Sequence, residues 1–154
     1  MSSIPAPRRI VTSNLSVSGS LGQLENSEPA VQVITEEVPI VSELDGNWYK
    51  RAVFTHDRVP TSNDGTDISA KEIPGSGLVL PQGANIRFNE IPPGGKAPMH
   101  RTSTTDYNIF LTGSMVLITP AEAHDPSAPD GAVKMQETVC RPGDVVVQRG
   151  TLHA

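Results

Sequence analysis

The sequence predicts an all-β fold, and three observations lead to that prediction. The chain of 154 residues contains 14 prolines and 13 glycines, which divide it by turns. Between the turns lie short runs rich in β-branched residues, and several alternate apolar with polar side chains as half-buried strands do. Almost no segment has the 3.6-residue apolar period of an amphipathic helix. A chain of this length can bury a real core, so a single sandwich or barrel is expected.

The first half of the chain is predicted to contain an arm followed by strands. Residues 1–30 are expected to form an N-terminal arm and loop, and residues 31–154 the folded barrel. The run 60–77 combines prolines, glycines and polar residues, which predicts a long surface loop acting as a lid or a dimer arm. The strands expected in this half lie at Ile10–Thr12, Val31–Ile40 and Trp48–Thr55.

The strand signal is sharper in the second half. Thr112–Gly113 is a turn signal between two β-rich runs, which predicts a hairpin there. A loop is expected over residues 121–131. The strands expected in this half lie at Leu78–Leu80, Ala84–Ile91, Tyr107–Leu111, Ser114–Thr119, Val133–Val139 and Val145–Val147.

Composition excludes several classes of protein. The formal net charge of -5 and the absence of a basic stripe argue against nucleic acid as a partner. No apolar run approaches the roughly 18 residues of a membrane-spanning helix. The N-terminus lacks the apolar core of a secretion signal, so a cytoplasmic location is expected. Cys140 is the single cysteine, so no intrachain disulfide forms, and a buried thiol is expected.

Two glycine-marked segments carry the chemistry of the chain. His100, Thr102, Thr104 and Asp106 have the two-residue spacing that places side chains on one face of an extended strand. His153 follows a second segment of turn and strand, and an antiparallel neighbour would place it opposite His100. Two imidazoles and one carboxylate are a ligand set for Fe(II), Mn(II), Zn(II) or Ni(II).

These segments resemble the two motifs of the cupin superfamily. Gly94-x5-His100-x-Thr102-x3-Asp106-x6-Gly113 is similar to the first motif, Gly-x5-His-x-His-x3–4-Glu-x6-Gly. The segment from Gly143 to His153 is similar to the second, Gly-x5-Pro-x-Gly-x2-His-x3-Asn. The resemblance implies a cupin-type double-stranded β-helix, a jelly-roll barrel. Within the superfamily, the segments resemble small single-domain cupins, whose fungal members occur in secondary metabolism and are described as cupin-domain oxidoreductases.

The chain departs from the cupin pattern at several positions. Thr102 stands where the first motif has its second histidine, and Asp106 replaces the glutamate. Arg149 stands in place of a proline, and His153 arrives one residue early. The sequence stops at Ala154, where cupins continue into closing strands, so either those strands are absent from a truncated sequence or the barrel closes differently.

The candidate residues each have an alternative reading. His100 is a metal ligand, a metal-free catalytic or substrate-binding group, or a structural residue. His153 is a ligand or pocket residue, or else a surface residue. Asp106 is the third member of the catalytic or ligand set, or it caps a backbone amide. Arg149 clamps a substrate carboxylate or pairs with Asp144. The substrate-binding set predicted around the histidines comprises Arg101, Thr102, Thr104, Tyr107, Arg149 and Phe88, with Tyr107 expected in the core.

Three functions follow from these residues and the resemblance. The first is a tailoring oxidoreductase of polyketide-type secondary metabolism, with a divalent metal on His100, Asp106 and His153. The second is a metal-free isomerase, dehydratase or decarboxylase in which His100 exchanges protons and Asp106 orients its ring. The third is a cupin that binds a small molecule without chemistry. A homodimer formed through N-terminal strands is expected, with a small molecule as the other partner.

Overall fold

The regular structure of the chain is almost wholly β-strand. The computed structural model describes residues 6–15, 28–60, 79–123 and 133–154. Within these ranges it forms nine strands and one short 3-10 turn at Leu44–Gly46. Every strand pairing is antiparallel. The predicted all-β class is therefore confirmed.

The chain divides into two compact units, Met1–Pro93 and Gly94–Ala154. The first unit contains a two-stranded ribbon and a three-stranded sheet. In the sheet, β4 is the middle strand between β3 and β5. The ribbon pairs β1 with β2. The strands of this unit are β1 (Arg8–Asn14), β2 (Val31–Glu37), β3 (Val41–Glu43), β4 (Trp48–His56) and β5 (Ala84–Glu90).

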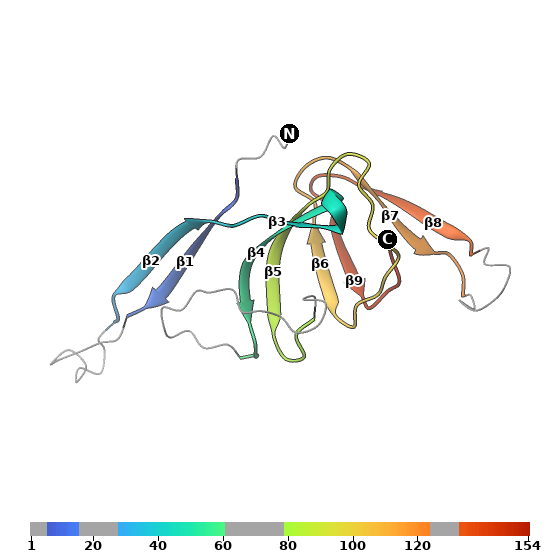
Figure 1. Cartoon of the computed structure of the whole chain (residues 1–154). Coiled ribbons are helices and arrows are strands. Elements are labelled where there is room, and N and C mark those ends of the chain that lie inside the picture. The colour runs from blue at the N-terminus through green and yellow to red at the C-terminus, as the bar shows by residue number, and fades with distance from the viewer. Residues whose placement is uncertain (1–5, 16–27, 61–78, 124–132) are drawn as a thin grey trace. The chain divides into compact units, whose positions relative to one another are not determined.

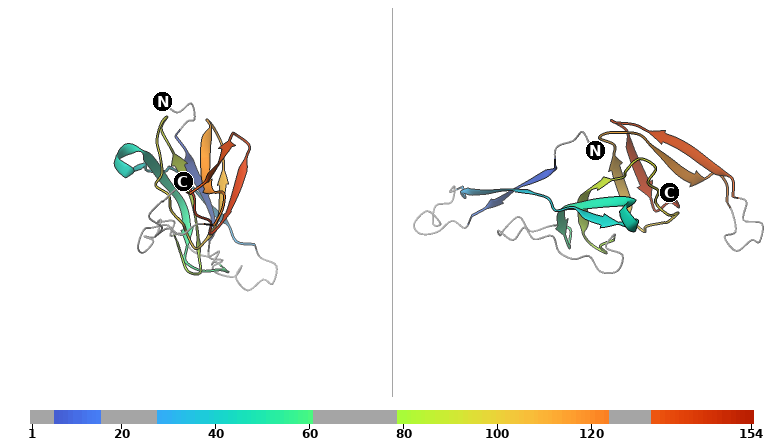
Figure 2. Two further views of the ribbon diagram at one scale, coloured as in Figure 1. Left: turned by 90° about the vertical axis from the view of Figure 1, so that its right-hand side faces the viewer. Right: turned by 45° about the horizontal axis from the view of Figure 1, so that its top comes forward.

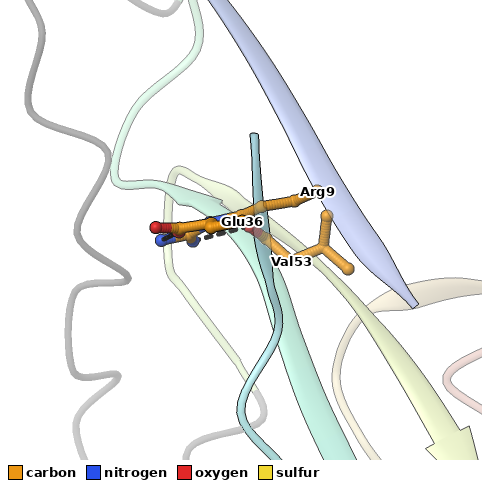
Figure 3. A network of polar contacts seen from close by, with 3 residues as sticks. All are labelled: Arg9, Glu36 and Val53. Carbon is orange, nitrogen blue, oxygen red and sulfur yellow. Dashed lines mark hydrogen bonds and ion pairs between the residues drawn. The ribbon is translucent and has the colours of Figure 1, made fainter. Parts of the chain in front are cut away.

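Two arginines join the ribbon of the first unit to its sheet. Arg9 on β1 pairs with Glu36 on β2 and donates from Nη1 to the backbone oxygen of Val53 at 2.9 Å (Figure 3). Val53 is the extra residue of a bulge in the β4–β5 ladder. Arg51 on β4 donates to the backbone oxygen of Val38, just after β2, at 2.9 Å. Because an isolated two-stranded ribbon is marginally stable, these guanidinium contacts help to hold it.

The second unit is one long two-stranded ribbon. β6 (Thr105–Ile109) pairs with β9 (Val145–Arg149), and β7 (Met115–Pro120) pairs with β8 (Met135–Cys140) (Figure 1). In the chain, the β7–β8 pair is thus enclosed between the two strands of the β6–β9 pair. Figure 2 shows the pairing of β7 with β8 from two further sides. Cys140, at the end of β8, is only 2% exposed, which confirms the predicted buried thiol.

A corner separates the two halves of this ribbon. Phe110 donates its backbone N–H to Asp144 at 3.0 Å and accepts one from Gly143 at 2.9 Å, so pairing continues across the corner. Gly113 and Gly143 have φ angles of 69° and 94°. These values lie in the left-handed region, which favours glycine because it has no Cβ. The glycines of the two sequence motifs therefore have a conformational role here.

The ribbon also folds back on itself. Ile118 on β7 and Ala154 exchange both backbone hydrogen bonds, at 2.9 and 3.0 Å. The segment after β9 therefore lies beside β7, on the edge that β8 does not occupy. A hairpin ribbon that folds back in this way is consistent with the winding of a jelly roll.

The strand positions agree with most of the sequence predictions, but the predicted hairpin is wrong. Tyr107–Leu111 and Ser114–Thr119 are not partners, since β6 pairs with β9 and β7 with β8. Thr112–Gly113 lies at the corner of the ribbon. Alternation specifies that a segment is extended and which face it buries, but it does not specify a partner strand. β3 was not predicted, and β1 extends through Ser13 and Asn14 into the expected loop.

Some predictions fall on residues outside the described ranges. The predicted lid or dimer arm at 60–77 lies outside them except for Pro60, and so does most of the loop at 121–131. A strand was predicted at Leu78–Leu80. Val79 and Leu80 are described and do not form a strand, whereas residue 78 lies outside the described ranges. β1, in the predicted arm, shares a sheet with β2. The domain boundary at residue 31 stays a prediction.

Replacing Gly143 by alanine should strain the corner of the ribbon. An added Cβ would meet no atom within 4 Å, so crowding is not the cause. An L-residue in the left-handed region costs roughly 1–2 kcal/mol, and the free energy of unfolding in urea should fall by about that amount. Gly143→Asn is the matched control, because asparagine tolerates this region better. Equal losses for both variants would contradict a conformational cause.

Candidate functional site

The backbone places His100 and His153 directly opposite each other. Each donates its N–H to the other's carbonyl, at 2.8 and 2.9 Å, which makes a closed hydrogen-bonded pair of antiparallel residues. Side chains at such a pair point to the same side of the ladder. The two ring centroids lie 4.4 Å apart, with the ring planes inclined at 56°. The structure therefore brings the two predicted histidines together.

Both imidazoles are oriented by the same type of backbone contact. Nδ1 of His100 lies 2.8 Å from the carbonyl oxygen of Pro98, and Nδ1 of His153 lies 2.8 Å from that of Thr151. A carbonyl oxygen only accepts, so each Nδ1 must carry the proton. In the neutral ring this leaves the lone pair on Nε2, the atom that can bind a metal or take up a proton.

Asp106 is held by two threonines. Thr102 donates its hydroxyl to Oδ2 at 2.9 Å, and Thr104 donates to Oδ1 at 2.7 Å. Both carboxylate oxygens are therefore engaged, and the three residues share one face of the segment, as the spacing predicts. Within the described residues the donors to Asp106 are these two hydroxyls, so the structure does not support the alternative that Asp106 caps a backbone amide.

The opposite face of β6 and β9 is exposed. Tyr107 is 70% exposed and lies opposite Val147, so the prediction that Tyr107 is a core residue is wrong. Arg149 is exposed opposite Thr105, and Arg101 is also exposed. Odd-numbered positions of β6 point away from the face that carries Asp106, because strand side chains alternate. This placement does not bring Tyr107, Arg101 or Arg149 to the carboxylate.

Asp144 and Phe88 are the remaining residues of the sequence-based predictions. Asp144 accepts the backbone N–H of Arg141 at 2.7 Å, so within the described residues its side chain bonds a turn amide and not Arg149. The turn explains this, since a short acidic side chain bonds nearby backbone readily. Phe88 lies on β5 in the first unit, and its substrate-binding role stays a prediction.

Sequence reasoning missed Asn108 and Gln148. Asn108 donates from Nδ2 to Oε1 of Gln148 at 2.7 Å, and Gln148 is only 7% exposed. Asn108 continues the two-residue spacing of Asp106, on the same face. Gln148 is a polar residue after three valines, and its position opposite Asp106 depends on the pairing of β6 with β9. The spacing from Asp106 was the available signal for Asn108.

The described residues supply two of the three predicted metal ligands in contact. The Nε2 atoms of His100 and His153 are suitable nitrogen donors. Asp106 accepts from Thr102 and Thr104 instead, and nowhere in the described ranges do three His, Cys, Asp or Glu side chains form a group that could hold a metal. The predicted three-ligand set is therefore not assembled here. A metal at this pair stays a prediction.

Comparisons with known proteins give the family context. No protein-family model matches the chain. The cupin-domain-containing oxidoreductase fogC of Aspergillus ruber is 26% identical over 102 residues, 66% of this chain and 44% of that protein. The chain resembles this fungal cupin. The expected resemblance to fungal cupin-domain oxidoreductases is thus confirmed.

Two further relatives of this cupin-like chain come from Diaporthe leptostromiformis. They are the phomopsin biosynthesis cluster proteins D and C', each 34% identical over 77 residues. Each match covers 50% of this chain and 34% of the relative. The chain thus spans between a third and a half of the length of these curated relatives.

Among the described residues of this cupin-like chain, no helix is long and apolar enough to cross a membrane.

Removing the Thr104 hydroxyl tests the contact with Asp106. In Thr104→Val, one oxygen of a half-buried carboxylate loses its donor while the side-chain shape is nearly kept. The free energy of unfolding should fall by about 1 kcal/mol, the usual scale for a hydrogen bond that is partly open to solvent. Thr105→Val, on the exposed face, is the control and should change it by less than about 0.5 kcal/mol. Equal effects in urea denaturation would argue against the contact.

Proposed function

We propose that this chain is part of a tailoring enzyme of secondary metabolism that acts on a small molecule. The observation that carries the proposal is the His100–His153 pair, with both Nδ1 atoms fixed by carbonyls and both Nε2 atoms left as reactive atoms. The names of the relatives, which place two of them in a biosynthetic cluster and call a third an oxidoreductase, support the metabolic role. A cytoplasmic location and a homodimer belong to the same proposal.

An oxidoreductase is the first form of this proposal, and the name of the Aspergillus ruber relative supports it. A divalent transition metal, once bound, would supply Lewis-acid or redox chemistry. His100 and His153 would hold it through Nε2, and the carbonyls of Pro98 and Thr151 would keep the rings oriented.

A metal-independent lyase or isomerase is the second form. It does not need Asp106 as a metal ligand, and the carboxylate is bonded to two threonine hydroxyls. The carbonyl of Pro98, in place of the predicted Asp106, then orients the ring of His100. His153 is 9% exposed, and His100 is more open. In this form His100 takes a proton from the substrate at Nε2 or returns it, as imidazoles do near neutral pH. Dehydration, isomerisation and decarboxylation all need such a proton transfer.

Genetic complementation tests the role of the histidine pair. Deleting the gene in the source organism should change the profile of small-molecule products measured by mass spectrometry, and the wild-type gene should restore it. His100→Asn should restore about a hundredth of the product or less, the scale of a lost acid–base group. His56→Asn is the matched control, since its Nδ1 also lies near a carbonyl, that of Arg58, but in the first unit. Full rescue by His100→Asn would overturn the proposal.

Metal analysis separates the two forms. An oxidoreductase of the first form should contain about one equivalent of a transition metal when it is purified without added metal or chelator. His100→Ala and His153→Ala should lose most of it, because affinity depends on the number of ligands. Less than about a tenth of an equivalent in the wild-type protein, together with activity that survives chelation, would favour the second form.

A further inference from the structure

Polar groups are concentrated on the face of the β6–β9 ribbon that carries Asp106. Among the described residues only three polar side chains are buried, and two of them, Gln148 and His153, lie five positions apart in the second unit. Gln148 sits opposite Asp106 in the ladder and diagonally opposite Asn108. Burying an amide costs free energy unless its groups are bonded. The bonding of this glutamine therefore has to be accounted for.

One hydrogen bond within this amide pair leaves the NH₂ group of one amide and the carbonyl of the other without a partner among the described residues. Asn108 donates one bond to Gln148 at 2.7 Å. In the orientation seen here, the groups without a partner among the described residues are the NH₂ group of Gln148 and the carbonyl of Asn108. Neither group is among the enclosed, unpaired side-chain atoms of the described residues, where such an atom is Oε1 of Gln32 in the first unit. Whichever way the two amides are turned, one NH₂ group and one carbonyl of the pair have no partner among the described residues.

We propose that Asn108 and Gln148 bind the edge of a neutral ligand that presents a carbonyl beside an N–H or O–H, such as a lactam or another amide. This rests on the proposed function and names the substrate class of the same face. The free NH₂ donates to the carbonyl of the ligand, and the free amide carbonyl accepts from its N–H or O–H. A site that hydrogen-bonds such an edge discriminates strongly against analogues without it.

The charges around the pair favour a neutral ligand over an anion. The Asp106 carboxylate lies opposite Gln148. Arg149 is exposed on the other face of β9, and Arg101 is also exposed. A carboxylate ligand on this face would therefore meet the like charge of Asp106, and Arg149 would not be on the same face to pair with it. The carboxylate clamp predicted for Arg149 from the sequence stays a prediction, and it would act on the other face of β9.

Binding of small probes, followed on the full chain by the side-chain amide signals of Asn108 and Gln148 in nitrogen-15 NMR, tests the inference. 2-Piperidinone, a lactam, should shift these signals saturably. N-methyl-2-piperidinone lacks the N–H and should bind about tenfold more weakly, as expected for one lost hydrogen bond. Valerate, an anion of similar size, should bind more weakly still.

Two variants and a control complete the test. Gln148→Leu keeps the buried volume and should abolish the saturable shifts, and Asn108→Ala should do the same if Gln148→Leu does not fold. Gln136→Leu, on an exposed position of β8, should leave them unchanged. The inference is overturned if the lactam and its N-methyl analogue bind equally, if valerate binds most tightly, or if binding survives in Gln148→Leu.

This outcome is separate from that of the proposed function. If lactam binding fails while His100→Asn still cannot complement the deleted gene, the substrate class is wrong and the histidine centre stands. If lactam binding is observed while His100→Asn complements fully, the amide pair is a binding site and the proposed reaction is wrong.

Discussion

The reciprocal backbone hydrogen bonds between His100 and His153 are the constraint on which the candidate site depends. They join two segments that are far apart in the chain and place the two imidazoles on one side of the ladder, 4.4 Å apart. The same ribbon brings Asp106 opposite Gln148, and its corner is set by glycines in the left-handed region. Because strand side chains alternate, a shift of one residue in this register would turn the polar face outward.

The hydrogen bonds on that face follow from the requirement that half-buried polar groups be paired. The Asp106 carboxylate accepts from two hydroxyls, and each imidazole donates to a carbonyl. Among the described residues of this face, the amides of Asn108 and Gln148 keep unpaired groups, as do the two Nε2 atoms. The unit therefore separates groups that maintain the structure from groups that remain free to meet a ligand.

The departures from the cupin motif are connected in the structure. Thr102 stands where the motif has a second histidine, and its hydroxyl bonds Asp106, which stands where the motif has glutamate. One change removes a metal ligand, and the same side chain engages the carboxylate that would have completed the ligand set. A two-histidine pair with a separate, hydroxyl-bound carboxylate is the result. This arrangement supplies two nitrogen ligands for a metal, or two imidazoles for proton transfer, without the carboxylate. Metal content therefore distinguishes the two chemistries.

The sequence by itself determined the all-β class, most of the strand positions, the cupin resemblance and the shared face of Thr102, Thr104 and Asp106. These follow from local alternation, turn residues and motif spacing. Only the tertiary structure decided that β6 pairs with β9 instead of forming a hairpin, that Tyr107 faces outward, and that Gln148 lies beside Asn108. Local patterns report which face of a strand is buried, whereas pairing partners depend on long-range hydrogen bonds that one segment does not encode.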